Sequence, residues 1–163
     1  MTAEIRRAHV RVPPIAWMVA AAAWALVIFC LSTGAFGLSF TEPLVAGGLR
    51  CLHLTVSDAS FWALHIFVRK LAHLAEYAIL AGLLCVSSEE VPLRWSPRRV
   101  LGCFLIVVAY SLTDEYHQSF VPGRNASLRD CGIDSIGGAM GILPYYVNYL
   151  RLRTICRTTS EVS

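Results

Sequence analysis

The sequence predicts an all-α integral membrane protein, a bundle of about four transmembrane helices that forms a single domain over residues 1–163. The first reason is composition. Hydrophobic residues make up 56% of the chain and charged residues only 15%, whereas soluble domains carry about 25% charged residues. The second reason is that the apolar residues gather in long runs, and a helix that crosses a bilayer needs about 20 of them. About four such runs use most of the chain, which leaves no room for a separate soluble domain.

The charge and cysteine patterns exclude other classes of protein. The net charge is only +3, and the basic residues form no run beyond short pairs, so we expect no nucleic acid as a partner. The six cysteines are scattered without a CxxC pair. Neither a disulfide framework nor a zinc knuckle is therefore indicated, although Cys51 and Cys131 could meet on one side of the membrane.

The first apolar run, PIAWMVAAAAWALVIFCL, predicts a helix from Pro14 to Leu31. Arginines precede it, as in a signal peptide, but the run is long and lacks a clear cleavage site, so we expect a retained span. The glycine-rich residues 32–57 predict a loop with at most one short interfacial turn.

The second helical pattern begins at the cap Ser57-Asp58-Ala59-Ser60 and runs unbroken to Val86. Because this length exceeds one span, we expect its first half to be an interfacial helical extension. The second transmembrane helix then starts near Lys70.

The last two helices have clear start signals. Ser96-Pro97, a cap followed by proline at the first helical position, predicts a third helix through VLGCFLIVVAYSL into an acidic stretch. The fourth starts at Ser127, which has capping-box spacing to Asp130, and extends to about Leu150.

The basic residues predict the orientation, because cytoplasmic loops are enriched in lysine and arginine. With the N-terminus inside, nine of the fourteen basic residues lie on the cytoplasmic side. We therefore expect a multi-pass protein of the cell membrane with both termini cytoplasmic. In this topology the polar ends of the second, third and fourth helices meet at the outer face.

Each of these three ends carries polar residues on one side, at helical spacing. The second helix carries Lys70, His73, Glu76 and Tyr77. The third carries Ser111, Asp114, His117 and Gln118. The fourth carries Asp130 and Asp134, then the small residues Gly137 and Gly141. We expect a compact bundle with a polar pocket opening outward, since ionisable groups at membrane depth are costly unless they are functional or paired.

The glycine pair has two interpretations. A GxxxG face lets another helix approach closely, so Gly137 and Gly141 could support a homodimer. Packing within one bundle explains the same face equally well.

Two long motifs stand in order, KLAHLAEYAILAGLL and DEYHQSFVPGRNASLRDCGIDSIGGAMG. They resemble the VanZ family of small bacterial membrane proteins, named for a component of a glycopeptide-resistance cluster that is linked to teicoplanin resistance. The resemblance is strongest over residues 57–141, and it implies a place in the bacterial inner membrane. By matching position it marks Lys70, His73, Glu76, Tyr77, Asp114, Glu115, His117, Gln118, Arg124, Asp130 and Gly137 as family-pattern residues. Asp134 departs from the asparagine that the pattern has there.

The polar residues suggest acid–base chemistry. A carboxylate beside an imidazole is the usual way to orient a general base, so Asp114 and His117 are the candidate base, and His73 and Glu76 would assist or act as acid. Histidine and carboxylates together also fit a divalent metal, held by these same four residues. Their spacing matches no named metal signature, and the sequence requires no cofactor.

Candidate binding residues surround this group. Lys70 and Arg124 would hold a phosphate, and Gln118 and Tyr77 are further substrate-binding candidates. Arg124 could equally form a structural clamp, and Lys70 alone could snorkel to water. We place Asp130 and Asp134 in a structural network.

Four other ionisable residues have ordinary, non-functional interpretations. Glu115 points away from the polar stripe and fits a solvated loop as well as a site, and His9, His53 and His65 read as incidental.

Our leading hypothesis is an enzyme that modifies an envelope lipid or a lipid-linked phosphate precursor at the outer leaflet, with an effect on glycopeptide susceptibility. No serine or cysteine is placed convincingly as a nucleophile, so hydrolysis by activated water is the natural chemistry. The rival is a non-enzymatic membrane protein that binds a lipid headgroup or glycopeptide, or that scaffolds partner proteins. A transporter is a third alternative, but four short spans offer little room for a pathway.

Overall fold

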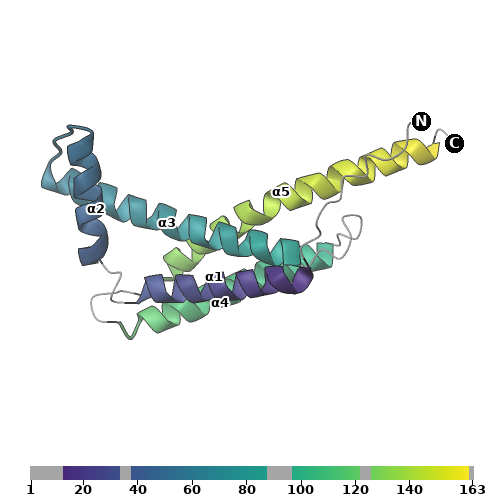
Figure 1. The fold of residues 1–163 in the computed structure, drawn as a ribbon, viewed down its shortest axis with the longest axis horizontal. Coiled ribbons are helices and arrows are strands. Elements are labelled where there is room, and N and C mark those ends of the chain that lie inside the picture. Colours follow the sequence, from purple (N-terminus) through teal and green to yellow (C-terminus); the bar gives the residue numbers. More distant parts are fainter. Residues whose placement is uncertain (1–12, 34–37, 88–96, 122–125, 162–163) are drawn as a thin grey trace.

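The computed structural model describes residues 13–33, 38–87, 97–121 and 126–161, and the regular structure there is entirely helical. This confirms the all-α prediction. The five helices are α1 (Pro14–Ser32), α2 (Leu38–Cys51), α3 (Asp58–Ser87), α4 (Pro97–Gln118) and α5 (Leu128–Glu161) (Figure 1).

The predicted caps at Ser57 and Ser127 act as expected, whereas the predicted cap at Ser96 lies outside the described residues. Ser60 N–H donates to Ser57 Oγ at 3.3 Å, the bond that a serine cap makes to the third residue of α3. Proline is the first residue of α1 and of α4, where its missing N–H would have no partner in any case. At α5, Arg129 N–H donates to Ser127 Oγ at 3.2 Å.

Within the range 32–57 predicted as a loop, the prediction is wrong for residues 38–51, which form the 14-residue helix α2. Glycine and an internal proline, Pro43, both disfavour this helix. Packing against α3 compensates, since Thr41 Oγ1 and His65 Nε2 lie 2.5 Å apart and His65 is fully buried. His65, which the sequence marked as incidental, therefore joins α2 to the first half of α3. The chain leaves α2 through His53, whose φ of 53° is left-handed.

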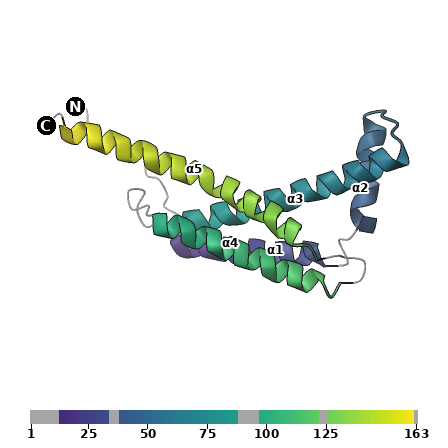
Figure 2. The same ribbon diagram turned by 180° about the vertical axis from the view of Figure 1, so that it is seen from behind.

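Helices α1, α3, α4 and α5 make the bundle, and α3 and α5 cross in its middle (Figures 1 and 2). Helix α2 stands across the first half of α3, away from the crossing. The crossing is close because α5 presents glycine there: a Cβ at Gly137 would overlap the Leu74 carbonyl, and one at Gly141 would overlap the Ala78 carbonyl. The glycine face that could support a homodimer is thus covered by α3 of the same chain.

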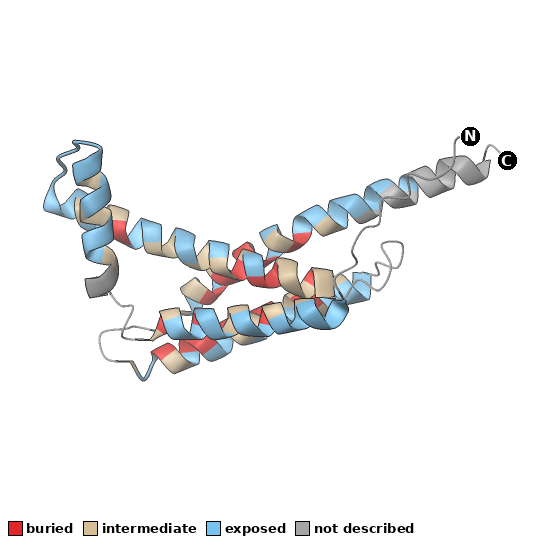
Figure 3. Ribbon diagram, in the orientation of Figure 1, coloured by how far each residue is buried: buried red, intermediate tan, exposed pale blue. Residues whose placement is uncertain are grey.

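Burial is concentrated at this crossing, while the outward faces of the helices are exposed (Figure 3). The core consists mainly of apolar side chains from four helices, Ile28, Tyr77, Leu80, Ala81, Cys85, Cys103, Val107 and Ile142. Large apolar side chains also cover the outside, for example Leu101, Leu105 and Ile106, each 55% exposed. Such a surface fits a lipid environment better than water.

Two helices in the described part of the chain, α1 and α3, are long and apolar enough to cross a membrane. This finding fits a membrane protein, whereas the count of four spans is not confirmed and stays a prediction.

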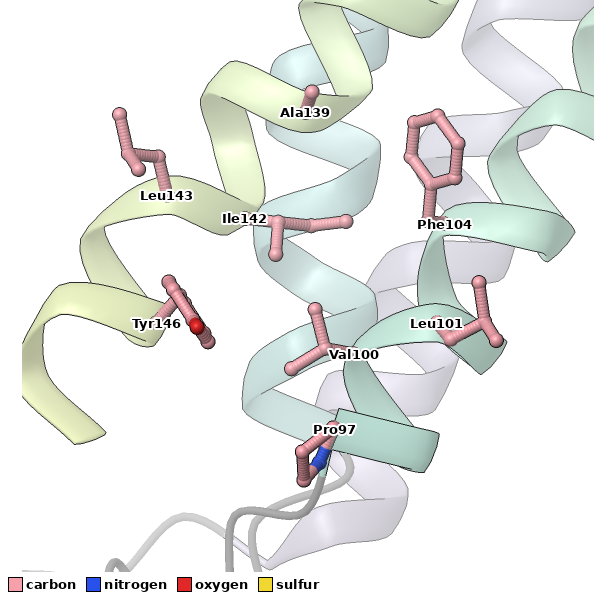
Figure 4. A pocket seen from close by; sticks show the side chains of 8 residues that line it. All are labelled: Pro97, Val100, Leu101, Phe104, Ala139, Ile142, Leu143 and Tyr146. Carbon is pink, nitrogen blue, oxygen red and sulfur yellow. The ribbon is translucent and has the colours of Figure 1, made fainter. Parts of the chain in front are cut away.

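An apolar pocket of about 410 Å³ lies between the first half of α4 and the middle of α5 (Figure 4). Its lining includes Val100, Phe104, Ile142 and Tyr146. The pocket is lined by the first residues of α4, whereas the predicted polar residues of α4 lie at the other end of the helix. The pocket and the polar residues are therefore separate.

Candidate functional site

Polar residues from the middle of α3, the end of α4 and the start of α5 meet. Lys70 on α3 forms an ion pair with Asp130 on α5. One turn further, His73 Nδ1 lies 3.6 Å from Asp134 Oδ1. Ser111 on α4 donates to Asp134 Oδ2 at 2.7 Å. These three contacts place residues from three helices in one polar cluster at the edge of the α3–α5 crossing.

Asp134 is the centre of this cluster. Its side chain is only 1% exposed, and a buried carboxylate is costly unless other groups satisfy it. Ser111 satisfies one oxygen, but Oδ1 has no hydrogen-bond partner. The 3.6 Å to His73 Nδ1 is just too long for a hydrogen bond. Asp134, which the sequence assigned only to a structural network, is therefore the residue that joins all three helices.

Tyr77 stands beside this carboxylate. It is fully buried, and its hydroxyl has no hydrogen-bond partner. The carboxylates of Asp114 and Asp134 lie near enough to act on this hydroxyl electrostatically. A tyrosine whose O–H is buried normally finds a partner, so this hydroxyl is a candidate contact for a polar ligand of the cluster.

Asp114 and Gln118 form a pair within α4. Gln118 Nε2 donates to Asp114 Oδ2 at 2.9 Å, and both residues are buried. Asp114 Oδ1 and His117 Nδ1 are each buried without a hydrogen-bond partner. The His117 ring instead lies against Phe29 of α1, with ring centroids 4.5 Å apart. The described hydrogen-bond partner of Asp114 is therefore Gln118 and not His117, which Asp114 was expected to orient, and the closest imidazole–carboxylate pair of the cluster is His73–Asp134.

Lys70 and Asp130 lie at the rim of the cluster. Their side chains are 43% and 35% exposed, so the ion pair is solvated and contributes about 1 kcal/mol or less. The Lys70 ammonium contacts Asp130 at this partly exposed position. Lys70 therefore reaches toward water, as the snorkelling interpretation predicts, and also joins α3 to α5.

Glu115 is buried, although the sequence left it even between a site and a solvated loop. Its Oε2 accepts the N–H of Ser127 at 2.6 Å. In a capping box the third helical residue would accept this N–H, but here that residue, Asp130, is paired with Lys70. Glu115 lies past the apolar run of α4. Burial raises the pKa of its carboxyl, and the hydrogen bond from the Ser127 N–H acts in the opposite direction.

The sequence reasoning missed the contribution of α1. Trp24 Nε1 donates to the Glu76 carbonyl at 2.9 Å, and Tyr110 Oη donates to the Ala25 carbonyl at 2.5 Å. Aromatic side chains with a polar tip inside apolar helices were the available signal. Glu76 itself is half-buried on α3.

The remaining predictions concern a metal, Arg124 and the cysteines. Among the side chains that the structure describes, no three histidine, cysteine, aspartate or glutamate residues converge as metal ligands. The geometry of the described side chains therefore gives no support to a divalent metal ion held by His73, Glu76, Asp114 and His117. Arg124 lies outside the described residues. Cys51 is exposed and Cys131 buried, and both are free.

The comparison with known families agrees with the motifs. A family model described as VanZ/LLP1 matches residues 17–150, a range that includes all the residues of the polar cluster. No curated protein and no solved structure matches the chain.

Proposed function

The chain belongs to the VanZ/LLP1 family, and from this premise we propose that it is a multi-pass membrane enzyme that modifies an envelope lipid or a lipid-linked phosphate precursor. The polar cluster would be its active site, at the outer leaflet. A change in susceptibility to glycopeptides such as teicoplanin would be the consequence for the cell.

The bundle supports a four-span topology. Helices α1 and α3 each carry a run that can cross the bilayer, and α4 and α5 pack against them with apolar outer faces. The uncharged run of α4 covers residues 100–113, which is shorter than the usual span of about 20. Arg98 and Arg99 at its start would snorkel to the cytoplasmic interface. Asp114 would mark the outer boundary.

The observation that carries the proposal is the arrangement of His73, Asp134 and Ser111. The sequence placed the general base at His117 with Asp114, but the described contacts favour His73, because Asp134 faces its Nδ1 and Ser111 holds the other oxygen of Asp134. A carboxylate at Nδ1 leaves Nε2 free to accept a proton from water. His117 and Asp114 remain the second acid–base group.

The reaction that this arrangement suits is hydrolysis of a phosphoester. His73 would take a proton from water, and the water oxygen would form a bond to phosphorus as the bond to the leaving oxygen breaks. His117 or Glu76 would return a proton to the leaving oxygen. Lys70 and Arg124 would hold the phosphate at the rim.

The rival function is binding or scaffolding without chemistry, and one observation favours it. The contacts Lys70–Asp130, Ser111–Asp134 and Glu115–Ser127 all join two helices. A polar network of this kind can serve helix packing alone.

The test is a mass-spectrometric profile of envelope lipids and lipid-linked precursors from a host that expresses the intact chain, His73→Gln or His117→Gln. His53→Asn is the matched control, because His53 is exposed at the end of α2 and asparagine tolerates its positive φ. We expect one lipid species to shift with the intact chain and the control, and the shift to disappear with His73→Gln. Identical profiles from equally abundant proteins would favour the binding function. Teicoplanin susceptibility is measured in the same strains.

A further inference from the structure

The polar cluster contains several buried atoms that lack a hydrogen-bond partner. They belong to α3, to the end of α4 and to the start of α5, which Ser111–Asp134 and His73–Asp134 join. The set comprises Asp114 Oδ1, Asp134 Oδ1, Tyr77 Oη, His73 Nδ1 and His117 Nδ1. Native proteins leave few such atoms unsatisfied, so these atoms call for polar partners beyond the described side chains.

The charge of the cluster decides which kind of molecule fits. Three carboxylates, Asp114, Glu115 and Asp134, are buried. The ammonium of Lys70, the lysine of the cluster, is already paired with Asp130. The two atoms that most need a partner are carboxylate oxygens, which accept hydrogen bonds and cannot donate them.

We propose that the cluster binds a primary ammonium group, carried by an amine-bearing headgroup. The inference rests on the proposed function and narrows its substrate to a zwitterionic headgroup such as phosphoethanolamine. The ammonium donates to Asp114 Oδ1 and Asp134 Oδ1, two carboxylates that both act electrostatically on the buried Tyr77 hydroxyl. The phosphate of such a headgroup stays at the rim, because inside the cluster it would face two carboxylates.

The burial gradient gives the ammonium a route. Asp134 is 1% exposed, whereas the His73 side chain is 21% exposed and Lys70, one turn away, is 43% exposed. A headgroup therefore enters past Lys70 and His73 and meets Asp134 at the inner end. Charge-assisted hydrogen bonds are stronger than neutral ones, so this inner contact dominates the selectivity.

The experiment titrates short-chain lipids into the full chain purified in detergent and follows binding by native mass spectrometry. The lipids share acyl chains and phosphate and differ in the end group, which is ethanolamine, choline, glycerol or none. We expect the ethanolamine lipid to bind roughly tenfold more tightly than the others. Choline carries the same charge without N–H donors, so its weaker binding separates hydrogen bonding from charge. Free ethanolamine as a competitor distinguishes a soluble amine from a lipid headgroup as the natural source.

Three variants test the assignment of the site. Asp134→Asn should remove the preference for the ethanolamine lipid, and Tyr77→Phe should weaken it with no change of charge. Asp58→Asn is the matched control, since Asp58 is exposed in the first turn of α3. If Asp134→Asn does not fold, Asp114→Asn takes its place.

Equal binding of all four lipids, or tightest binding of the lipid with phosphate alone, would overturn the inference. The outcome is separable from that of the proposed function. Selective binding with an unchanged envelope profile would contradict the enzyme and keep the ammonium site. A profile shift confined to a lipid without an amine would do the reverse.

Discussion

At the scale of single residues, the cluster depends on one hydroxyl. Ser111 is fully buried, and its Oγ donates the hydrogen bond that the structure shows on Asp134 Oδ2. Two residues further along α4, Thr113 donates to the Tyr110 carbonyl of its own helix and is exposed. The two hydroxyls have similar chemistry, but only Ser111 satisfies a buried charge.

We expect Ser111→Ala to lower the free energy of unfolding by about 1–3 kcal/mol, because it leaves a second carboxylate oxygen of Asp134 unsatisfied. Thr113→Ala is the control and should change it by less than about 0.5 kcal/mol. The measurement is denaturant unfolding in detergent micelles. Equal effects of the two substitutions would show that Asp134 has another partner.

At the scale of helices, contacts with neighbouring helices determine how α5 begins and where it packs. The N-terminus of α5 is capped by Glu115 of α4, and α5 crosses α3 through Gly137 and Gly141. Both contacts depend on residues that are far apart in sequence.

Glu115→Ala should destabilise the protein by about 1 kcal/mol, because the Ser127 N–H at the start of α5 loses its acceptor. Glu115→Gln keeps an acceptor oxygen and should recover most of the loss. Hydrogen exchange of the first turn of α5 reports this directly. Unchanged exchange in both variants would contradict the capping role.

Gly141→Ala should destabilise the bundle by about 1–3 kcal/mol, because the added Cβ overlaps the Ala78 carbonyl and forces α3 and α5 apart. Gly132→Ala on the same helix is the control, since a Cβ there meets nothing within 4 Å. It should be neutral or stabilise α5 by up to about 1 kcal/mol. Thermal unfolding in detergent measures both, and a harmless Gly141→Ala would show that the crossing is looser than described.

At the scale of the whole molecule, the topology decides where the polar cluster opens. In the proposed topology, with the N-terminus in the cytoplasm, α2 and the start of α3 would lie outside the cell and the end of α5 inside. Cys51, the exposed last residue of α2, reports the outer side. Thr154, exposed near the end of α5, reports the inner side.

In intact cells, a membrane-impermeant maleimide should label a variant whose single cysteine is Cys51. It should label Thr154→Cys, in a chain without other cysteines, only after the membrane is permeabilised. The opposite pattern would place the cluster at the cytoplasmic face, and labelling of both without permeabilisation would contradict the four-span topology.

By itself the sequence determined four of the five described helices and the family, because both depend on patterns that are local along the chain. Apolar runs, caps at Ser57 and Ser127, and proline at the start of α4 predict where helices begin. Helical spacing placed His73, Asp114 and Asp134 on polar faces of three different helices. The family match followed from motifs that stand in a fixed order.

Only the tertiary structure decided which of these residues meet. Helix α2 forms despite its glycines because His65 of α3 packs against it, and Asp134 faces His73 and Ser111 because α5 crosses α3 through glycine. Spacing along one helix pairs Asp114 with either His117 or Gln118, and the packed bundle shows the hydrogen bond to Gln118. Which residues of two packed helices meet depends on the crossing angle of the helices and on the position of the crossing along each of them. No pattern within a single helix encodes those quantities.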